Sequence, residues 1–445
     1  MPDLMNIGAS GLRAYSSALA TVGDNIANAQ TAGYARRTVR LREAPAAGDI
    51  ILSRNSIRPG GVEVAGLSRS VDSWLVDDAR ISSGDANQAA TRLNWIQAAE
   101  RGIADDGHNI GTRLTAIFNI ADELASDPAS QPLRQQFLLA IDETAASFRQ
   151  TAAALSHAAD GVAGAAEGEI TQLNTDLNAL ERFNEGLRRA RSGSSNEATL
   201  LDERDRLLDA VSSRLPITTS FDPRGAASVR VAGNGDALVD SGVVATLAAI
   251  VGADGSVAFA LTSPTSSTIT PSSGSLAGMT DASHHVADLR ASVDVLAGRV
   301  ATDLNAAHQA GLNVNGNPGA ALFAFGGNAA FLSAVALNAN DVAAANASSA
   351  NGNVLNFANL RAPSGVEQAW ASIVNAQAQT TASARAQDAA TGTRYDGATA
   401  ARDAISEVDI DREAADLLRF QQAYEAAART IQVARETMQS ILNIF

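Results

Sequence analysis

Residue types that could do chemistry are few in this sequence and lie far apart. Five histidines occur, at positions 108, 157, 284, 285 and 308, and Asp105 and Asp106 lie close before the first of them. A zinc site on a helix would show two histidines four residues apart or a His-Glu motif, and neither pattern occurs. We therefore expect exposed or loosely packed histidines and no metal centre.

Two short segments have some features of ligand-binding loops. Gly233-Asn234-Gly235 lacks the third glycine of a dinucleotide fingerprint and has strand-like sequence on both sides, which predicts a hairpin turn. The segment 313–317 has the asparagines of a calcium loop but neither its carboxylates nor its glycine position. No serine lies in a nucleophile elbow, and Asp77-Asp78 has ordinary polar neighbours. The sequence therefore predicts no enzyme activity and no cofactor, although a catalytic group assembled from distant residues would leave no such motif.

The composition favours long helices and excludes several classes of partner. Hydrophobic residues make up 46% of the 445 residues but aromatic residues only 4%, a balance that suits helices rich in alanine. The net charge is -15 and all 33 basic residues are arginine, so we expect no nucleic-acid partner and no binding to an anionic membrane. The chain has no cysteine, no start typical of a cleaved signal and no apolar stretch long enough to span a bilayer. We expect neither disulfides nor membrane insertion.

The middle of the chain changes from helical to strand-like sequence and back. Apolar residues recur every three or four positions over 85–124, 133–187, 200–215 and 286–304, which predicts helices. Between 216 and 280, short alternating runs are joined by glycine-containing turns, which predicts a small β domain.

The two ends carry the most regular apolar stripes. The first, from Met5 to Ile26, predicts a helix roughly 33 Å long, followed by extended chain at 38–42 and 62–64. The second, from Ile410 to Phe445, predicts a helix about 55 Å long and is interrupted only by Glu413. An amphipathic helix most often packs on its own core. Because polar or extended segments separate both stripes from the middle, we favour a second interpretation, in which they pair with each other and with further copies of the chain.

The sequence therefore predicts a mainly α, discontinuous and nested multi-domain fold. Paired N- and C-terminal helices form a coiled-coil polymerisation domain from residues 1–50 and 406–445. A long helical bundle takes residues 51–215 and 281–405, and the small β domain, 216–280, is inserted in it.

Short motifs at both ends resemble those of the flagellar rod, hook and hook-associated proteins. Asn25-Ile26-Ala27-Asn28, followed by Thr31, Gly33 and Tyr34, is similar to the N-terminal signature of that family, with Ala32 where the signature usually has proline. Residues 419–424, Arg-Phe-Gln-Gln-Ala-Tyr, are similar to the C-terminal motif. Stretches at 61–72, 201–208 and 315–323 extend the resemblance, and 201–208 favours the members that form the junction between hook and filament.

The resemblance implies a secreted structural subunit of the bacterial flagellum. It implies export without cleavage through the flagellar type III channel, an export chaperone on the C-terminal helix, and a homo-oligomeric ring between the hook protein and the second hook-associated (junction) protein. The alternatives are another axial subunit (hook, rod or second hook-associated protein), or a secreted adhesin or effector on the same scaffold. The residues expected at the assembly interface are Leu12, Tyr15, Leu19, Val22, Asn25, Ile26, Asn28, Gly33, Tyr34, Leu417, Phe420, Gln421, Tyr424, Ile431, Met438, Ile441 and Phe445.

Overall fold

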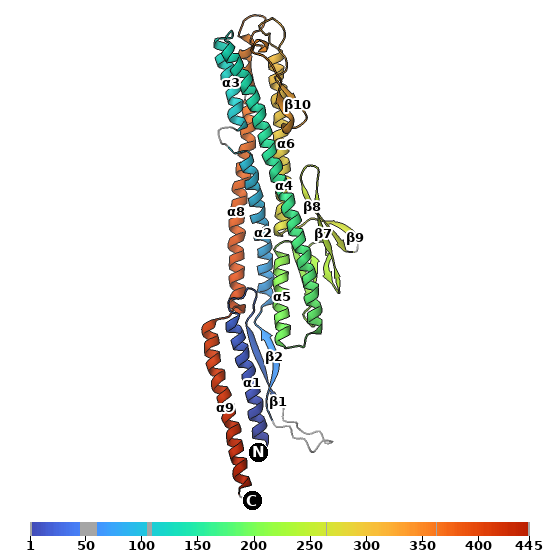
Figure 1. The fold of residues 1–445 in the computed structure, drawn as a ribbon, viewed down its shortest axis with the longest axis vertical. Helices are drawn as coiled ribbons and strands as arrows, with labels where there is room; N and C mark the ends of the chain where they lie inside the picture. Colours follow the sequence, from blue (N-terminus) through green and yellow to red (C-terminus); the bar gives the residue numbers. More distant parts are fainter. Residues whose placement is uncertain (1, 45–59, 105–108, 264, 362, 444–445) are drawn as a thin grey trace.

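Long helices build most of the protein and run along its length, with the first and last helices side by side at one end (Figure 1). The computed structural model describes residues 2–44, 60–104, 109–263, 265–361 and 363–443. The mainly α class predicted from the sequence is confirmed. The helices are α1 (Pro2–Ala27), α2 (Ser73–Gly102), α3 (Ile110–Ser126), α4 (Gln131–Arg189), α5 (Ser195–Ser212), α6 (Gly274–Gln309), α7 (Gly352–Asn356), α8 (Val366–Ser406) and α9 (Ile410–Leu442), with short 3-10 turns at Ala329–Phe331, Ala339–Asp341 and Phe357–Arg361.

The strands form small antiparallel sheets. Gly233 and Gly235 have φ angles of 97° and 76° and connect the second and third strands of the four-stranded sheet, so the turn predicted at this place is confirmed. The described sheets are β1 (Arg37–Ala44) with β2 (Gly61–Arg69); β3 (Ile217–Phe221), β4 (Ala227–Val231), β5 (Ala237–Asp240) and β6 (Val243–Val244); β7 (Thr246–Val251), β8 (Val257–Ser263) and β9 (Thr265–Ile269); and β10 (Phe323–Phe325) with β11 (Leu332–Ala334).

Two apolar cores hold the region between residues 73 and 406, which we call the body. The first core lies where α3, the start of α4 and the end of α6 meet, and it buries Phe118, Phe137 and Phe148 completely or almost so. The second lies where the end of α4 and α5 meet the sheets β3–β6 and β7–β9, and it buries Leu177 and Phe259. Burial of large apolar side chains is the main stabilising contribution in such cores.

Three element boundaries differ from the expected ones. α2 begins at Ser73 rather than near 85, because the Asp72 side chain accepts hydrogen bonds from the backbone N–H groups of Trp74 and Leu75 and caps the helix. α6 begins at Gly274, inside the range expected for the β domain, and it buries apolar residues from Leu276 onward. β2 pairs with β1 and packs beside α1, so the expected division at residue 50 would separate two strands of one hairpin.

Candidate functional site

The helices α1 and α9 lie side by side and antiparallel, and with the β1–β2 hairpin they make up what we call the terminal pair (Figure 1). A Cβ atom at Gly8 would lie 2.5 Å from Cγ1 of Ile431, and one at Gly11 would lie 3.3 Å from Cβ of Ala427. Glycine at these two positions therefore lets the helix backbones approach closely. The buried side of α1 consists of Gly8, Gly11, Ala14, Ala18, Thr21, Val22 and Asn25.

The residues expected at the interface differ in their exposure. Val22 and Asn25 are buried, whereas Tyr424, Met438 and Ile441 are 39%, 43% and 41% exposed. Phe445 lies outside the described residues. The half-buried members are Leu12, Tyr15, Leu19, Ile26, Asn28, Tyr34, Leu417, Phe420 and Ile431, and the other exposed members are Gly33 and Gln421.

The terminal pair keeps further apolar side chains at its surface. Leu4, Leu418 and Val433 are 47%, 59% and 59% exposed, and together with Met438 and Ile441 they leave apolar area on α1 and α9 uncovered. Contiguous exposed apolar surface on a soluble chain commonly marks a protein-protein contact. The terminal pair therefore has apolar surface available for contacts with other proteins.

Asn25 connects four segments of the terminal pair. Its Nδ2 donates to the backbone oxygen of Arg37 at 2.8 Å and to Oε2 of Glu413 at 2.9 Å. Its Oδ1 accepts from the backbone N–H of Arg37 at 3.0 Å and from the hydroxyl of Tyr34 at 2.9 Å. Asn25 is only 1% exposed, so these bonds satisfy a buried amide and fix α1 to the following loop, to the start of β1 and to α9.

Glu413, the single charge within the α9 stripe, is fully buried in the terminal pair. Its Oε1 accepts a hydrogen bond from Nε of Arg36 at 2.6 Å, and its Oε2 accepts the bond from Asn25. Arg36 also reaches Asp416 at 3.3 Å. The interruption of the stripe is therefore a buried ion pair between α9 and the loop after α1. The spacing of apolar residues alone does not reveal this pair.

Tyr34 completes this polar cluster as a neutral donor. Burial raises the pKa of its phenol to about 12, although the nearby Arg37 guanidinium opposes the rise. The hydroxyl therefore keeps its proton at any physiological pH and can donate to Asn25 throughout.

Ion pairs connect the terminal pair to helix α5 of the body. Nη2 of Arg37 lies 2.6 Å from Asp202, and Nη2 of Arg69 lies 2.8 Å from Asp205. Within the body, Nε of Arg80 lies 2.7 Å from Asp209. We call these six side chains the ionic cluster. Asp202 and Asp205 belong to the 201–208 stretch that carries the family resemblance, so that stretch supplies the carboxylates on which the hairpin docks.

Asp205 remains charged inside this cluster. Burial alone would raise the pKa of its carboxyl group, but the guanidinium groups of Arg204, Arg69 and Arg80 together hold the pKa below its ordinary value. The bonds to Arg69 and Arg204 therefore persist into mildly acidic solution.

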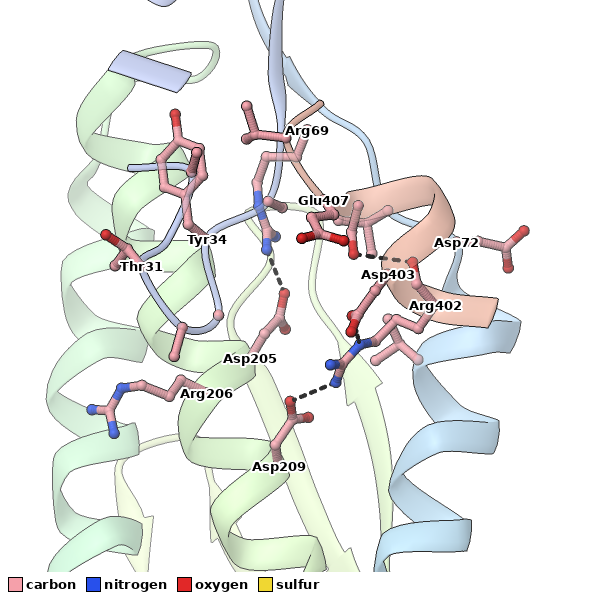
Figure 2. Close-up of a pocket in the computed structure, with 18 of the residues that line it drawn as sticks. Thr31, Tyr34, Arg69, Asp72, Asp205, Arg206, Asp209, Arg402, Asp403 and Glu407 are labelled. Atoms are coloured by element: carbon pink, nitrogen blue, oxygen red, sulfur yellow. Dashed lines mark hydrogen bonds and ion pairs between the residues drawn. The ribbon is translucent and has the colours of Figure 1, made fainter. Parts of the chain in front are cut away.

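A cavity of about 450 Å³ lies beside the ionic cluster, between the loop after α1 and the ends of α5 and α8. Figure 2 shows Arg69 directed at Asp205 and Arg402 directed at Asp209. Charged groups of both signs line the cavity, and Arg402 pairs with Asp403 as well as with Asp209.

The other candidate residues do not come together in a site. His308 is 1% exposed, so the expectation of a loosely packed histidine is wrong here: its Nδ1 lies 2.6 Å from the Ala320 oxygen and its Nε2 accepts from the Ala343 N–H at 2.9 Å. His108, Asp105 and Asp106 lie outside the described residues. Across the described ranges, no three metal-ligating side chains are grouped to hold an ion. The described helices include none long and apolar enough to cross a membrane.

Comparisons with known proteins agree with the arrangement of ends and body. Residues 5–34 match the model of the flagella basal body rod protein, and residues 403–444 match that of the flagellar basal body rod FlgEFG protein C-terminal region. These two matches cover α1 with its following loop and α9. Both ends of the chain, which lie side by side in the fold, are therefore similar to flagellar basal body rod proteins.

The body identifies the family. Residues 96–323, just over half of the chain, match the model of the flagellar hook-associated protein FlgK helical domain. The chain therefore belongs to the flagellar hook-associated protein FlgK family.

Individual relatives are distant in sequence. Flagellar hook-associated protein 1 of Salmonella typhimurium is 25% identical over 344 residues, which cover 73% of this chain and 60% of the relative. Flagellar hook-associated protein 1 of Bacillus subtilis is 22% identical over 493 residues, which cover 97% of this chain and 96% of the relative. The flagellar hook junction protein FlgK from Burkholderia pseudomallei has a similar fold, with a TM-score of 0.50 at 19% identity over 55% of this chain and 46% of that one. This chain thus spans about 60% of the length of the Salmonella relative.

Proposed function

We propose that this chain is the structural subunit of the junction between flagellar hook and filament and has no catalytic activity. The observation that carries the proposal is the match of the body to the FlgK helical domain between ends that match flagellar rod proteins. The relatives from Salmonella typhimurium and Bacillus subtilis are both described as flagellar hook-associated protein 1, which supports the same role.

Polymerisation would use the terminal pair. Its uncovered apolar side chains, Leu418, Val433 and Met438 among them, offer α1 and α9 of neighbouring copies an area to bury. Charge supports this division of roles: the ends (1–72 and 407–445) carry 12 arginines and 13 carboxylates, a net charge of -1. The body carries 21 arginines and 35 carboxylates, a net charge of -14. Adjacent ends can therefore approach with little repulsion, whereas adjacent bodies repel at low ionic strength.

The partners follow from that role. They are further copies of the chain, the hook protein below, the second hook-associated (junction) protein above, and an export chaperone that covers the C-terminal helix before secretion through the type III channel. The residues proposed for the copy-to-copy contacts are the exposed and half-buried members of the terminal pair named above. Export would be uncleaved and the working location the outside of the cell.

A strain that lacks the gene tests the proposal directly. Its flagella would be examined by electron microscopy, and flagellin would be assayed in the culture medium. We expect hooks without filaments and flagellin lost to the medium, and the wild-type gene on a plasmid should restore the filaments.

Two other outcomes would reject the proposal. Absent hooks would assign the chain to the rod or the hook. Normal filaments would favour a secreted adhesin or effector on the same scaffold.

A further inference from the structure

The contacts between the terminal pair and the body are polar, whereas each part has apolar packing of its own. Both cores of the body are built from residues between 99 and 370, and no described residue of α1, α9 or the β1–β2 hairpin belongs to them. The chain crosses between the two parts in two short segments, 70–72 and 407–409. Apolar burial therefore does not fix the angle between the terminal pair and the body.

The contacts that do cross are concentrated at the β1–β2 hairpin. Arg37 and Arg69 bind Asp202 and Asp205 of α5, and both carboxylates are less than a fifth exposed. The backbone N–H of Leu67 donates to the oxygen of Gly193 at 2.9 Å, in the turn before α5. A Cβ atom at Gly66 would lie 2.8 Å from Cα of Gly193, so the hairpin touches that turn backbone to backbone.

A further backbone bond, from the Arg36 N–H to the Ser406 oxygen at 2.8 Å, also crosses between the two parts, and a cavity lies beside these contacts. The 450 Å³ cavity has the loop 29–35 of the terminal pair on one side and Arg206, Asp209 and Arg402 of the body on the other. A change of angle could close or widen this cavity without disturbing either core. In this arrangement the ion pairs would restrain a hinge between the two parts, and breaking them would release it into the space of the cavity.

We propose that the ionic cluster is an electrostatic latch on a hinge between the terminal pair and the body. With the latch closed, the angle between the two parts has one value. When the charge of Asp205 is removed, the angle varies while both parts stay folded. Copies that share the same packing of α1 and α9 could then hold their bodies at different angles. The inference concerns the single subunit and does not depend on the junction role.

Helix α5 offers a matched pair of substitutions for the test. Asp205 lies within ion-pair distance of the guanidinium groups of Arg69, Arg80 and Arg204. Glu203, two residues away, pairs only with the half-exposed Arg206 among the described residues. Asp205→Asn and Glu203→Gln each remove one negative charge from the same helix, but only the first removes it from the latch.

The chain has no cysteine, so pairs of cysteines for spin labels can be introduced at exposed alanines of the full chain. Ala20 in α1 and Ala389 in α8 lie on the two sides of the hinge and are exposed. Ala20 with Ala426 reports on the terminal pair alone, and Ala291 with Ala389 reports on the body alone. Pulsed electron-electron double resonance then measures the distribution of each distance between the two spin labels in the purified subunit.

We expect Asp205→Asn to widen the distance distribution between Ala20 and Ala389 at least twofold. The other two distributions should stay narrow, and Glu203→Gln should leave all three unchanged. Arg69→Gln, which leaves α5 intact, should repeat the effect of Asp205→Asn.

Three results would overturn the proposal. An unchanged distribution across the hinge in both Asp205→Asn and Arg69→Gln would mean that other contacts fix the angle. Widening of the body pair in both variants would mean that the cluster holds the body together rather than the hinge. A broad distribution between Ala20 and Ala426 in the wild-type subunit would mean that no folded terminal pair exists for the latch to hold.

Discussion

The terminal pair and the body are both helical, yet they are stabilised in different ways. The body buries large side chains such as Phe148 and Leu177 completely, and it carries nearly all of the net charge. The terminal pair packs through Gly8, Gly11 and other small residues, holds one buried polar cluster around Asn25, and leaves apolar side chains exposed. The difference supports the proposal that neighbouring copies complete the terminal pair, whereas the body buries its large apolar side chains within one copy.

The largest effect is expected from a charge in the seam between α1 and α9. Ile431→Asp would place a carboxylate against Gly8, at a cost of about 3 kcal/mol or more, and should abolish filament attachment. Thermal unfolding of the body, followed by circular dichroism, should be unchanged. Gln432→Asp adds the same charge at an exposed neighbouring position and should leave the filaments in place. If an Ile431→Asp strain still carried filaments, the seam between α1 and α9 would not be part of the assembly interface.

A cavity in the core of the body should destabilise the body and leave the terminal pair unchanged. Phe148→Ala removes a completely buried ring and should lower the free energy of unfolding of the body by about 3–5 kcal/mol. Denaturant titration measures that loss, and amide exchange in α1 and α9 should not change. Leu139→Ala on the same helix removes a side chain that is 56% exposed and should cost far less. Loss of protection in α1 as well would mean that the two parts unfold together.

Two glycines of α1 allow the effect of close packing on stability to be distinguished from the effect of helix propensity. Gly8→Ala should destabilise the terminal pair by about 1–3 kcal/mol, because the new methyl group meets Ile431. Gly23→Ala meets nothing within 4 Å and should stabilise α1 by about 1 kcal/mol through helix propensity alone. Hydrogen exchange of the α1 amides measures both changes. If Gly8→Ala also increased protection, close packing at that glycine would be excluded as the reason for its place in the seam.

The smallest effect is a pH dependence confined to the body. Burial lowers the pKa of His308, although the Ala320 oxygen and nearby Asp341 partly oppose the shift. Because the folded pKa lies below the unfolded value of about 6.5, the stabilisation is fully present above that pH and is lost as the pH falls toward the folded pKa. The loss amounts to at most about 1.4 kcal/mol for each pH unit. His308→Gln should flatten the dependence of body stability on pH between 4 and 7, and an unaltered slope would assign it to other groups.

The ion pairs of Asp205 should respond to acid only at lower pH. The pKa of Asp205 is held below its ordinary value, so its contribution is present above about pH 4 and is lost as the pH falls further. Acid should therefore weaken the packing around His308 before it weakens the ion pairs of Asp205. Asp209 should lose its charge at a higher pH than Asp205, because burial raises its pKa although Arg80 and Arg402 oppose the rise.

Local patterns in the sequence were sufficient for most of the fold. The recurrence of apolar residues predicted the long helices, and Gly233-Asn234-Gly235 predicted the turn between β4 and β5, because both signals depend on neighbours along the chain. The start of α2 was missed, since Trp74 and Ile81 in its first turns are 71% and 59% exposed and form no apolar stripe. The burial of α2 comes from contacts with α6 and α8, which no local pattern records.

The interface was predicted in outline, but its central residues were not. Large residues such as Leu12 and Tyr15 define the stripe in the sequence, yet the buried line of α1 follows Gly8, Gly11 and Ala14, whose small size matters only once α9 is beside them. Glu413 was visible as the only charge in its stripe, which is the one signal that could have identified it. Its partners Asn25 and Arg36 are almost the whole chain away, and the pairing of Arg37 with Asp202 is equally non-local.

The hydrogen bond between Asn25 and Glu413 joins residues 388 positions apart, and we expect this separation to influence the order of folding. Two helices at such a distance along an unfolded chain find each other slowly, because contacts remote in sequence slow folding. Once the body has folded, the segments before α9 and after α1 meet, where the Arg36 N–H donates to the Ser406 oxygen at 2.8 Å. The body then acts as a short tether that raises the effective concentration of α1 and α9 for each other. The first and last helices of the chain should therefore be the last to pair, and an amide-exchange pulse during refolding should find α9 protected only after α4 and α6.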